Sequence, residues 1–209
     1  MNQKEEEYAF NHEIGHALQN WAGVEAALEY LVAACSTTKG GGTDLCIGYR
    51  SIENLRAKLS YLNALFEHKY CTRPEFLKQW GKLHKRINSL KTLRNRIAHG
   101  RPVITSPMPS GGRVRLKEPA FFDKSVGQKT DLESYFKHGL GIVDIAEHAN
   151  RFTALAVCLH NFVCVLNARE KRFPESLEQP PRRPTIRSIE ARMREASGRR
   201  QRPSSKSRR

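Results

Sequence analysis

The sequence predicts an all-α protein: a bundle of four to five helices with a long loop or hairpin insertion and a disordered, basic C-terminal tail. Apolar residues recur at intervals of three and four over long stretches, which is the spacing of amphipathic helices. Glycine and proline cluster between these stretches, and a segment rich in Arg, Pro and Ser follows the last one. We therefore expect one helical domain over residues 1–170, with the insertion at 101–131, and a tail over 171–209.

The first helix is expected from about Glu5 to Ala34, because a continuous apolar face runs from Phe10 to Val32. A glycine-rich loop ends this helix, and we interpret it as a linker because it lacks the Lys-Ser/Thr ending of a phosphate-binding loop. A second helix is expected from near Ser51 to about Tyr70.

The third helix is expected to begin at Pro74, a favourable residue for a first turn, and to end at His99. Gly100 suits the left-handed conformation that stops many helices, and Pro102 prevents the helix from resuming. The outer face of this helix is expected to be basic.

Residues 101–131 break the helical pattern, and within them 103–105 and 113–116 are expected to pair as a small hairpin. Such an insertion forms either a lid over a substrate or an irregular surface loop. The last helix is expected over about 132–169, and it is apolar nearly all round from residue 152 onward. A further short helix is expected at 186–196.

The charge of the chain indicates a polyanionic partner. It has 36 Lys and Arg against 21 Asp and Glu, a net charge of +15. The tail from Lys171 contributes 13 basic and 4 acidic residues, which leaves +6 on the rest. Nucleic acid fits this balance better than an acidic membrane surface. A solvated tail that only aids solubility is the alternative.

The cysteines and the apolar segments favour a cytoplasmic protein that does not enter a membrane. The five cysteines are odd in number and contain no Cys-x-x-Cys pair, so we expect free thiols in a reducing compartment. The longest apolar stretch, 154–166, is interrupted by His160 and Asn161 and is too short to span a bilayer.

The segment Leu93-Arg94-Asn95-Arg96-Ile97-Ala98-His99-Gly100 carries the candidate active site. Arg94 falls on an apolar stripe, in register with Ile87 and Ile97, where a guanidinium needs oxygen atoms from a carboxylate or a phosphate. His99 lies five residues later, about 140° around and about 7.5 Å along the helix. One chain thus places the two residues near each other only loosely, whereas two chains facing across a two-fold axis assemble a tighter site.

This segment resembles the motif of the HEPN superfamily, an Arg followed after four to six residues by a His, often with a polar residue directly after the Arg. Here the matching residues are Arg94, Asn95 and His99. The resemblance implies a helical bundle, a homodimer and metal-independent cleavage of RNA without a cofactor. It also implies a toxin or antiviral effector, with a neutralising antitoxin protein as a possible partner. Some members of the superfamily lack catalysis.

RNA carries its own nucleophile, the 2′-hydroxyl, so the protein has to move protons and stabilise phosphoryl charge. We expect His99 to transfer protons, Arg94 to hold phosphoryl oxygens through its planar fork, and Asn95 to orient the imidazole or a phosphate. A set of neighbouring cations is expected to bind the RNA backbone: Arg96, Lys85, Arg86, Lys91 and Arg101. The alternative for Arg96 is that it is only a surface charge and does not bind RNA.

Two alternatives remain open at this motif. A non-catalytic HEPN domain would bind RNA or a partner protein through the same surface. A purely structural role would pair Arg94 with a carboxylate of the bundle, such as Glu25 or Glu53, and leave His99 as a helix end.

The pentapeptide His12-Glu13-Ile14-Gly15-His16 matches His-Glu-x-x-His, the zinc protease pattern. The extended pattern requires a Gly and a third His, but Gln19 and Ala22 stand there. We also expect His12 and His16 to lie off the apolar face, so a zinc metalloprotease is a minor alternative and we expect no metal.

Overall fold

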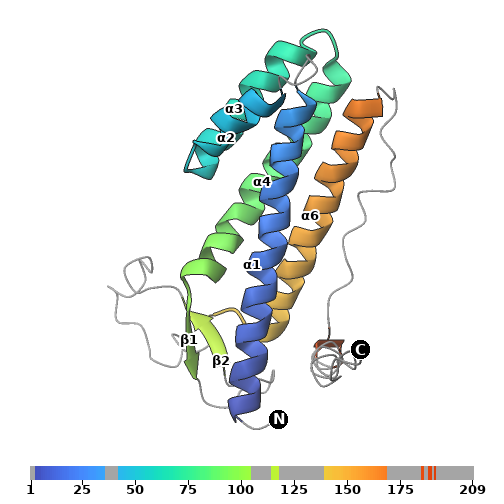
Figure 1. Ribbon diagram of the computed structural model, residues 1–209. Coiled ribbons are helices and arrows are strands. Elements are labelled where there is room, and N and C mark those ends of the chain that lie inside the picture. The colour runs from blue at the N-terminus through green and yellow to red at the C-terminus, as the bar shows by residue number, and fades with distance from the viewer. Residues whose placement is uncertain are drawn as a thin grey trace, which may run out of the picture. The chain divides into compact units, whose positions relative to one another are not determined.

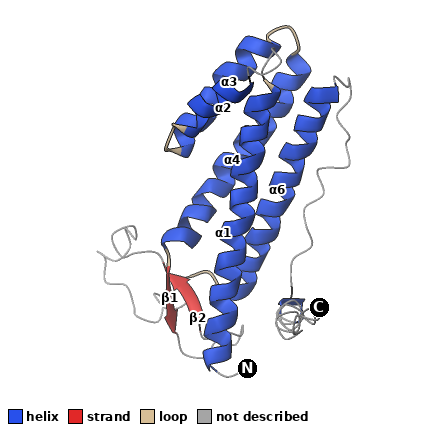
Figure 2. Cartoon of the chain, in the orientation of Figure 1, coloured by secondary structure: helices blue, strands red, loops and turns tan. Residues whose placement is uncertain are grey.

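The computed structural model describes residues 3–35, 42–104, 114–117 and 139–168, together with Thr185, Ser188, Ile189 and Ala191. Within these residues the chain forms five helices and one small antiparallel sheet, so the predicted all-α class is confirmed (Figures 1 and 2). The helices are α1 (Gln3–Ala34), α2 (Gly42–Arg50), α3 (Leu55–Tyr70), α4 (Pro74–His99) and α6 (Ile142–Ala168). The strands are β1 (Arg101–Ile104) and β2 (Val114–Lys117).

The chain divides into two compact units, each described separately below. The bundle unit comprises residues 17–95 and 149–181. The hairpin unit comprises residues 1–16, 96–148 and 182–209. Helices α1, α4 and α6 each contribute residues to both units.

The core of the bundle unit is a set of aromatic side chains from several helices. Phe66 of α3 stacks on Trp80 of α4 with ring centroids 4.9 Å apart, and on Phe162 of α6 at 5.7 Å. Trp21 of α1 meets Phe152 of α6 edge to face at 5.1 Å. Rings in these arrangements add roughly 0.5–1.5 kcal/mol per pair beyond the area they bury. These contacts join α1, α3, α4 and α6.

The second predicted helix begins later than expected. The N-cap of α3 is Asn54, whose side chain accepts a hydrogen bond from the Ala57 amide at 2.8 Å. Residues 42–50 form the separate short helix α2, which the sequence analysis did not predict. This helix has nine residues, so it is shorter than the window over which apolar periodicity identifies a helix.

The hairpin expected within the insertion is confirmed. Strands β1 and β2 pair antiparallel, with Val103 opposite Arg115 and Ile104 opposite Val114. Leu140 adds a bridge on the other side of β2, because its backbone exchanges two hydrogen bonds with Leu116, at 2.9 and 3.1 Å. The remaining residues of the insertion, 105–113 and 118–131, lie outside the described residues.

The last helix was predicted to start too early. Residues 139–141 are not helical, since Leu140 pairs with β2, and α6 begins only at Ile142. The start is stabilised by Asp144, whose carboxylate accepts a hydrogen bond from the Gly141 amide at 2.9 Å, as one half of a capping box does. A long-range strand pairing thus decided this boundary.

The basic tail lies outside the described residues except at four positions. Ser188, Ile189 and Ala191 are helical, inside the short helix expected at 186–196. Thr185 and Ser188 cap each other, with backbone amides donating to side-chain oxygens at 3.0 and 3.2 Å.

The apolar stretch 154–166, which was expected to be too short to span a bilayer, is part of the longer helix α6. Taken as a whole, its segment Ile142–Asn167 is long and apolar enough to cross a bilayer by length and composition. Half of its apolar window is buried within the structure, and the core helices of soluble proteins pass the same test. The segment is therefore weak evidence for a membrane.

Candidate functional site

Helix α4 positions the predicted motif, and its end confirms the expected boundary at His99. Its apolar stripe is buried, with Leu83, Ile87, Leu90 and Ile97 between 0% and 8% exposed. The Gly100 amide closes the final turn by donating to the Arg96 carbonyl at 2.9 Å.

Gly100 ends α4 for a different reason from the one predicted. The positive φ that the left-handed helix stop requires occurs among the described glycines only at Gly139, so that prediction was wrong. A Cβ at Gly100 would instead lie 2.5 Å from Leu116 Cγ and 2.7 Å from the Arg96 carbonyl oxygen. The missing side chain makes room for β2 to pack against the end of the helix.

Arg94 lies on the buried stripe, as predicted, and it has no carboxylate partner. The residue is half-buried, and its Nε is fully buried with no hydrogen-bond partner among the residues that the structure describes. Its Nη1 donates to the Asn95 side-chain oxygen at 3.2 Å. The alternative pairing with Glu25 or Glu53 was wrong, since no ion pair of Arg94 occurs in the described part of the chain.

Asn95 and His99 are both exposed. Asn95 holds the Arg94 guanidinium rather than the imidazole. His99 makes no hydrogen bond or ion pair with any described residue. The boundary between the two units falls between Asn95 and Arg96. Arg94 is half-buried in the bundle unit, and His99 is exposed in the hairpin unit.

The cations expected to bind RNA divide into an exposed and a half-buried set. Lys85 and Arg101 are exposed, whereas Arg86, Lys91 and Arg96 are half-buried. The Arg86 Nη1 donates to the Cys158 thiol at 3.6 Å, which ties this guanidinium to α6. Arg96 already has an interaction within the chain.

Within the bundle unit, the exposed side of α4 carries a regular stripe of basic and hydroxyl side chains. Its members are spaced alternately four and three residues apart, which puts them on one helical face. All of them are exposed: Lys78, Lys82, Lys85, Ser89 and Thr92. This basic stripe confirms the predicted basic outer face and narrows it to these positions.

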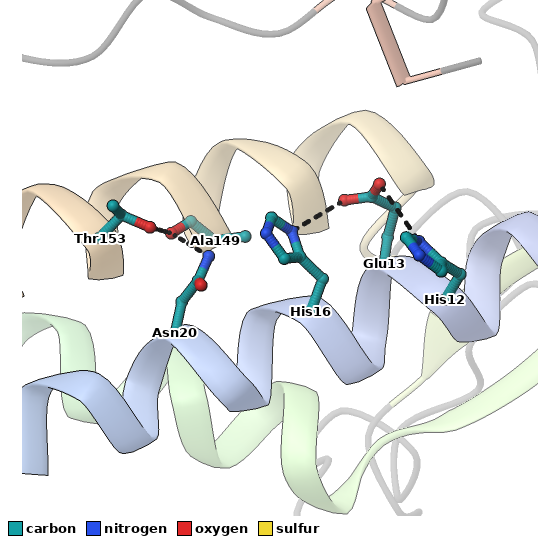
Figure 3. A network of polar contacts seen from close by, with 6 residues as sticks. All are labelled: His12, Glu13, His16, Asn20, Ala149 and Thr153. Atoms are coloured by element: carbon teal, nitrogen blue, oxygen red, sulfur yellow. Dashed lines mark hydrogen bonds and ion pairs between the residues drawn. The ribbon is translucent and has the colours of Figure 1, made fainter. Parts of the chain in front are cut away.

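The zinc-protease pattern forms a different arrangement, centred on Glu13 (Figure 3). The Glu13 side chain is 1% exposed, and its two oxygens lie 3.8 Å from His12 Nδ1 and 3.6 Å from His16 Nδ1. The imidazoles are 38% and 34% exposed, in agreement with their predicted position off the apolar face. Among the described residues, no three His, Cys, Asp or Glu side chains are placed to hold a metal ion.

Sequence reasoning missed the burial of Glu13. Glu13 follows Phe10 by three residues and precedes Ala17 by four, so it occupies the apolar stripe of α1. Arg94 was selected because an ionisable residue lies on the apolar stripe of a helix. The same reasoning selects Glu13. Figure 3 also shows Asn20 and Thr153 donating to the Ala149 carbonyl, at 3.2 and 3.1 Å, in the bundle unit.

The thiols are free, as predicted, and two of them are poor nucleophiles. Burial raises the pKa of Cys35 to about 11, against a smaller lowering by Lys69. Burial and the nearby Glu29 carboxylate also raise the pKa of Cys46. Both thiols therefore stay protonated at neutral pH, and neither is a candidate for covalent catalysis.

No protein-family model matches this chain, and no curated protein and no solved structure is significantly similar to it. Any function must therefore be argued from its own residues.

Proposed function

We propose that this chain is a metal-independent endoribonuclease of the HEPN type that acts as a homodimer. The observation that carries the proposal is the state of Arg94, a half-buried guanidinium with a buried Nε and no carboxylate partner among the described residues. Burying a guanidinium is unfavourable unless oxygen atoms satisfy it, and a phosphodiester supplies such atoms in a matching planar geometry. The resemblance of Arg94, Asn95 and His99 to the HEPN motif supports the same assignment.

The reaction needs only groups that the motif offers. A base removes the proton of the 2′-hydroxyl, the 2′-oxygen bonds to phosphorus, and the bond to the 5′-oxygen breaks as an acid protonates it. The products are a 2′,3′-cyclic phosphate and a free 5′-hydroxyl. His99 is exposed at the end of α4, where its imidazole is accessible to a substrate for proton transfer. Arg94 stabilises the phosphoryl charge, and Asn95 positions the guanidinium through its hydrogen bond.

A homodimer accounts for the angular separation of the two residues. Residues five positions apart are separated by about 140° around an ideal helix, so one chain offers Arg94 and His99 only a loose arrangement. Two copies related by a two-fold axis supply two imidazoles, one as base and one as acid, together with two guanidinium groups. We therefore propose a composite active site to which both copies contribute.

RNA binding is supported by the basic stripe and by the charge of the tail. Lys78 and Lys85 are exposed on one face of α4, and the chain as a whole carries +15. Such a surface attracts the phosphate backbone without sequence preference. The resemblance further suggests a cytoplasmic toxin or antiphage effector that no membrane holds and that a neutralising protein restrains.

The proposal is tested with the purified full-length protein and a labelled single-stranded RNA in excess chelator. The wild type should cleave, and a 2′-deoxy substitution at the scissile nucleotide should block cleavage. His99→Ala should lower the cleavage rate by roughly 10²–10⁴-fold, because it removes the proton-transfer group. Arg94→Lys should also lower it, since lysine keeps the charge but loses the planar fork.

Matched variants separate catalysis from folding and from general charge loss. His68→Ala changes an exposed histidine of α3, and Arg56→Ala changes an exposed arginine of the same helix; both should keep cleavage near the wild-type rate. Circular dichroism and thermal melting should show every variant folded. Wild-type protein that neither binds nor cuts RNA would sink the proposal.

A non-catalytic RNA-binding domain is the second candidate, and the hydrogen bond between Arg94 and Asn95 favours it. That bond occupies one guanidinium nitrogen within the same chain, away from His99. Such a domain would bind RNA and leave it uncut, and Arg94→Ala would then weaken binding at least as much as His99→Ala. Gel-shift titration of both variants distinguishes the two candidates.

A further inference from the structure

One surface of the bundle unit is nearly free of charge in a chain of which 27% is charged. Residues 17–34 of α1 and 149–167 of α6 contain only three charged residues: Glu25, Glu29 and Arg151. Glu25 accepts a hydrogen bond from Trp21 Nε1 at 2.8 Å, and Glu29 forms an ion pair with Arg50 of α2. The two acidic side chains therefore have partners of their own within the unit.

Helices α1 and α6 lie side by side and run in the same direction. Asn20 donates to the Ala149 carbonyl, a Cβ on Gly23 would lie 3.8 Å from the Ala156 Cβ, and the Tyr30 and His160 rings meet at 6.4 Å. The contacts thus advance together along both helices, so the exposed residues beside them belong to one continuous surface. We call this surface the α1–α6 face; its exposed residues include Ala22, Ala26, Tyr30, Thr153, Val157 and Cys164.

Two large side chains on the α1–α6 face are left in solvent. Tyr30 is 57% exposed and Val157 is 49% exposed. The most apolar window of α6 is only half buried, although core helices of soluble proteins are mostly buried. Leaving this area in water is unfavourable by roughly 25 cal/mol per Å² of apolar surface, so burial by a partner is favourable.

We infer that the α1–α6 face is the surface through which two copies of this chain associate. Each copy carries a net charge of +15, so two copies repel each other wherever their basic surfaces meet. Repulsion is least when the two copies approach through faces that carry almost no charge. A different partner protein would more readily supply acidic groups for the basic surfaces. A bilayer interior is a poor match, because polar Thr153 and Asn161 occur on or beside this face.

The face has the size of a small interface. Eighteen residues of helix span about 27 Å and two packed helices are about 20 Å across, so the projected footprint is about 540 Å². This lies below the roughly 800 Å² per partner of a standard interface, in the range of weaker associations. The inference takes up the homodimer of the proposed function, but it rests on this surface alone.

The experiment measures the mass of the full-length protein by size-exclusion chromatography with light scattering at micromolar concentrations. We expect a dimer for the wild type. Val157→Lys places a cation on the face of each copy and should raise the dimer dissociation constant by roughly 100-fold or more. Ile47→Lys is the matched control, since Ile47 is 60% exposed on α2, a helix that contributes no residue to this face, and its variant should stay dimeric.

Two variants of opposite charge at position 157 test whether loss of the dimer comes from repulsion rather than from misfolding. Val157→Glu alone should also weaken the dimer, whereas a mixture of the Lys and Glu variants should recover it by attraction between unlike faces. A monomeric wild type, a dimeric Val157→Lys variant, or a mixture that stays monomeric would each overturn the inference. A monomeric wild type that binds phosphatidylcholine vesicles through Val157 would assign the face to a membrane instead.

RNA cleavage by the same variants distinguishes a failure of this inference from a failure of the proposed function. A Val157→Lys monomer that has lost cleavage supports the composite site. One that still cleaves leaves the inferred interface in place and contradicts the composite active site of the proposed function.

Discussion

Arg94 and Glu13 are charged side chains on apolar stripes, and the environment of each determines its role. Glu13 is almost fully buried beside two half-exposed imidazoles. Arg94 has a buried Nε, a neutral amide beside it and no carboxylate among the described residues. Removing a buried polar group leaves its polar neighbours without a partner, whereas a guanidinium with no anionic neighbour among the described residues is suited to an anion from outside.

Replacing Glu13 should destabilise the protein far more than replacing an exposed glutamate. We expect Glu13→Ala to lower the free energy of unfolding by about 2–4 kcal/mol, because it leaves a cavity and removes the buried acceptor. Glu67→Ala, at an exposed position of α3, should change it by less than about 0.5 kcal/mol. Urea unfolding of both variants measures the difference. Equal effects would mean that the buried carboxylate contributes nothing to stability.

The half-buried His84 should make the stability depend on pH. Burial lowers the pKa of His84 below its ordinary value, so the unfolded chain binds a proton more readily than the folded chain. The contribution of His84 is therefore fully present above the unfolded pKa and is lost as the pH falls through that value towards the folded pKa. His84→Gln should lose less stability than the wild type between about pH 7.5 and about pH 5.5.

The matched control for His84 is His68→Gln, at an exposed position of α3. Its stability should follow the wild-type pH dependence in urea unfolding. If His84→Gln also follows the wild type, burial at His84 has no effect on acid stability.

At the scale of elements, periodicity and glycine or proline signals predicted α1, α4 and the hairpin, whereas long-range contacts set the remaining boundaries. The end of α4 at His99 was predicted correctly from Gly100 and Pro102, although Gly100 does not adopt the left-handed conformation on which that prediction relied. The start of α6 depends on the pairing of Leu140 with Leu116, which no local pattern reveals. Helix α2 has only nine residues, which is too short for its apolar periodicity to be recognised.

Alanine substitutions at Gly100 and Gly81 should change the stability of the protein in opposite directions. At Gly100 a Cβ would lie 2.5 Å from Leu116 Cγ, so Gly100→Ala should destabilise the protein by about 1–3 kcal/mol. At Gly81, inside α4, nothing lies within 4 Å of the added Cβ, so Gly81→Ala should stabilise it by about 0.5–1 kcal/mol. Thermal unfolding of both variants checks the signs. A neutral Gly100→Ala would show that β2 can move away from the end of α4.

At the scale of the whole molecule, charge is the dominant property. The bundle unit has a basic stripe on α4 and a nearly uncharged α1–α6 face. The first suits a polyanion and the second suits another copy of the same basic chain. The motif at Arg94, Asn95 and His99 remains a prediction that binding and cleavage assays must decide.

Salt should shift the two proposed associations in opposite directions. RNA affinity should fall as salt rises, and a Lys78→Ala, Lys85→Ala double variant should reduce the slope of log affinity against log salt by about 1.4. Dimer affinity should instead rise with salt, because screening weakens the repulsion between +15 chains. Arg56→Ala on α3 is the control for the slope. A dimer that weakens in salt would contradict an uncharged interface.

The sequence by itself determined the helical class, the burial of the α4 stripe around Arg94, the end of that helix at His99 and the basic character of the chain. These properties depend on local spacing and composition, which one chain displays in full. Only the tertiary structure decided that Arg94 lacks a carboxylate partner, that Glu13 is buried between two imidazoles, and that Gly100 makes room for Leu116. Each of these depends on which distant residues come together, and packing selects such contacts rather than periodicity.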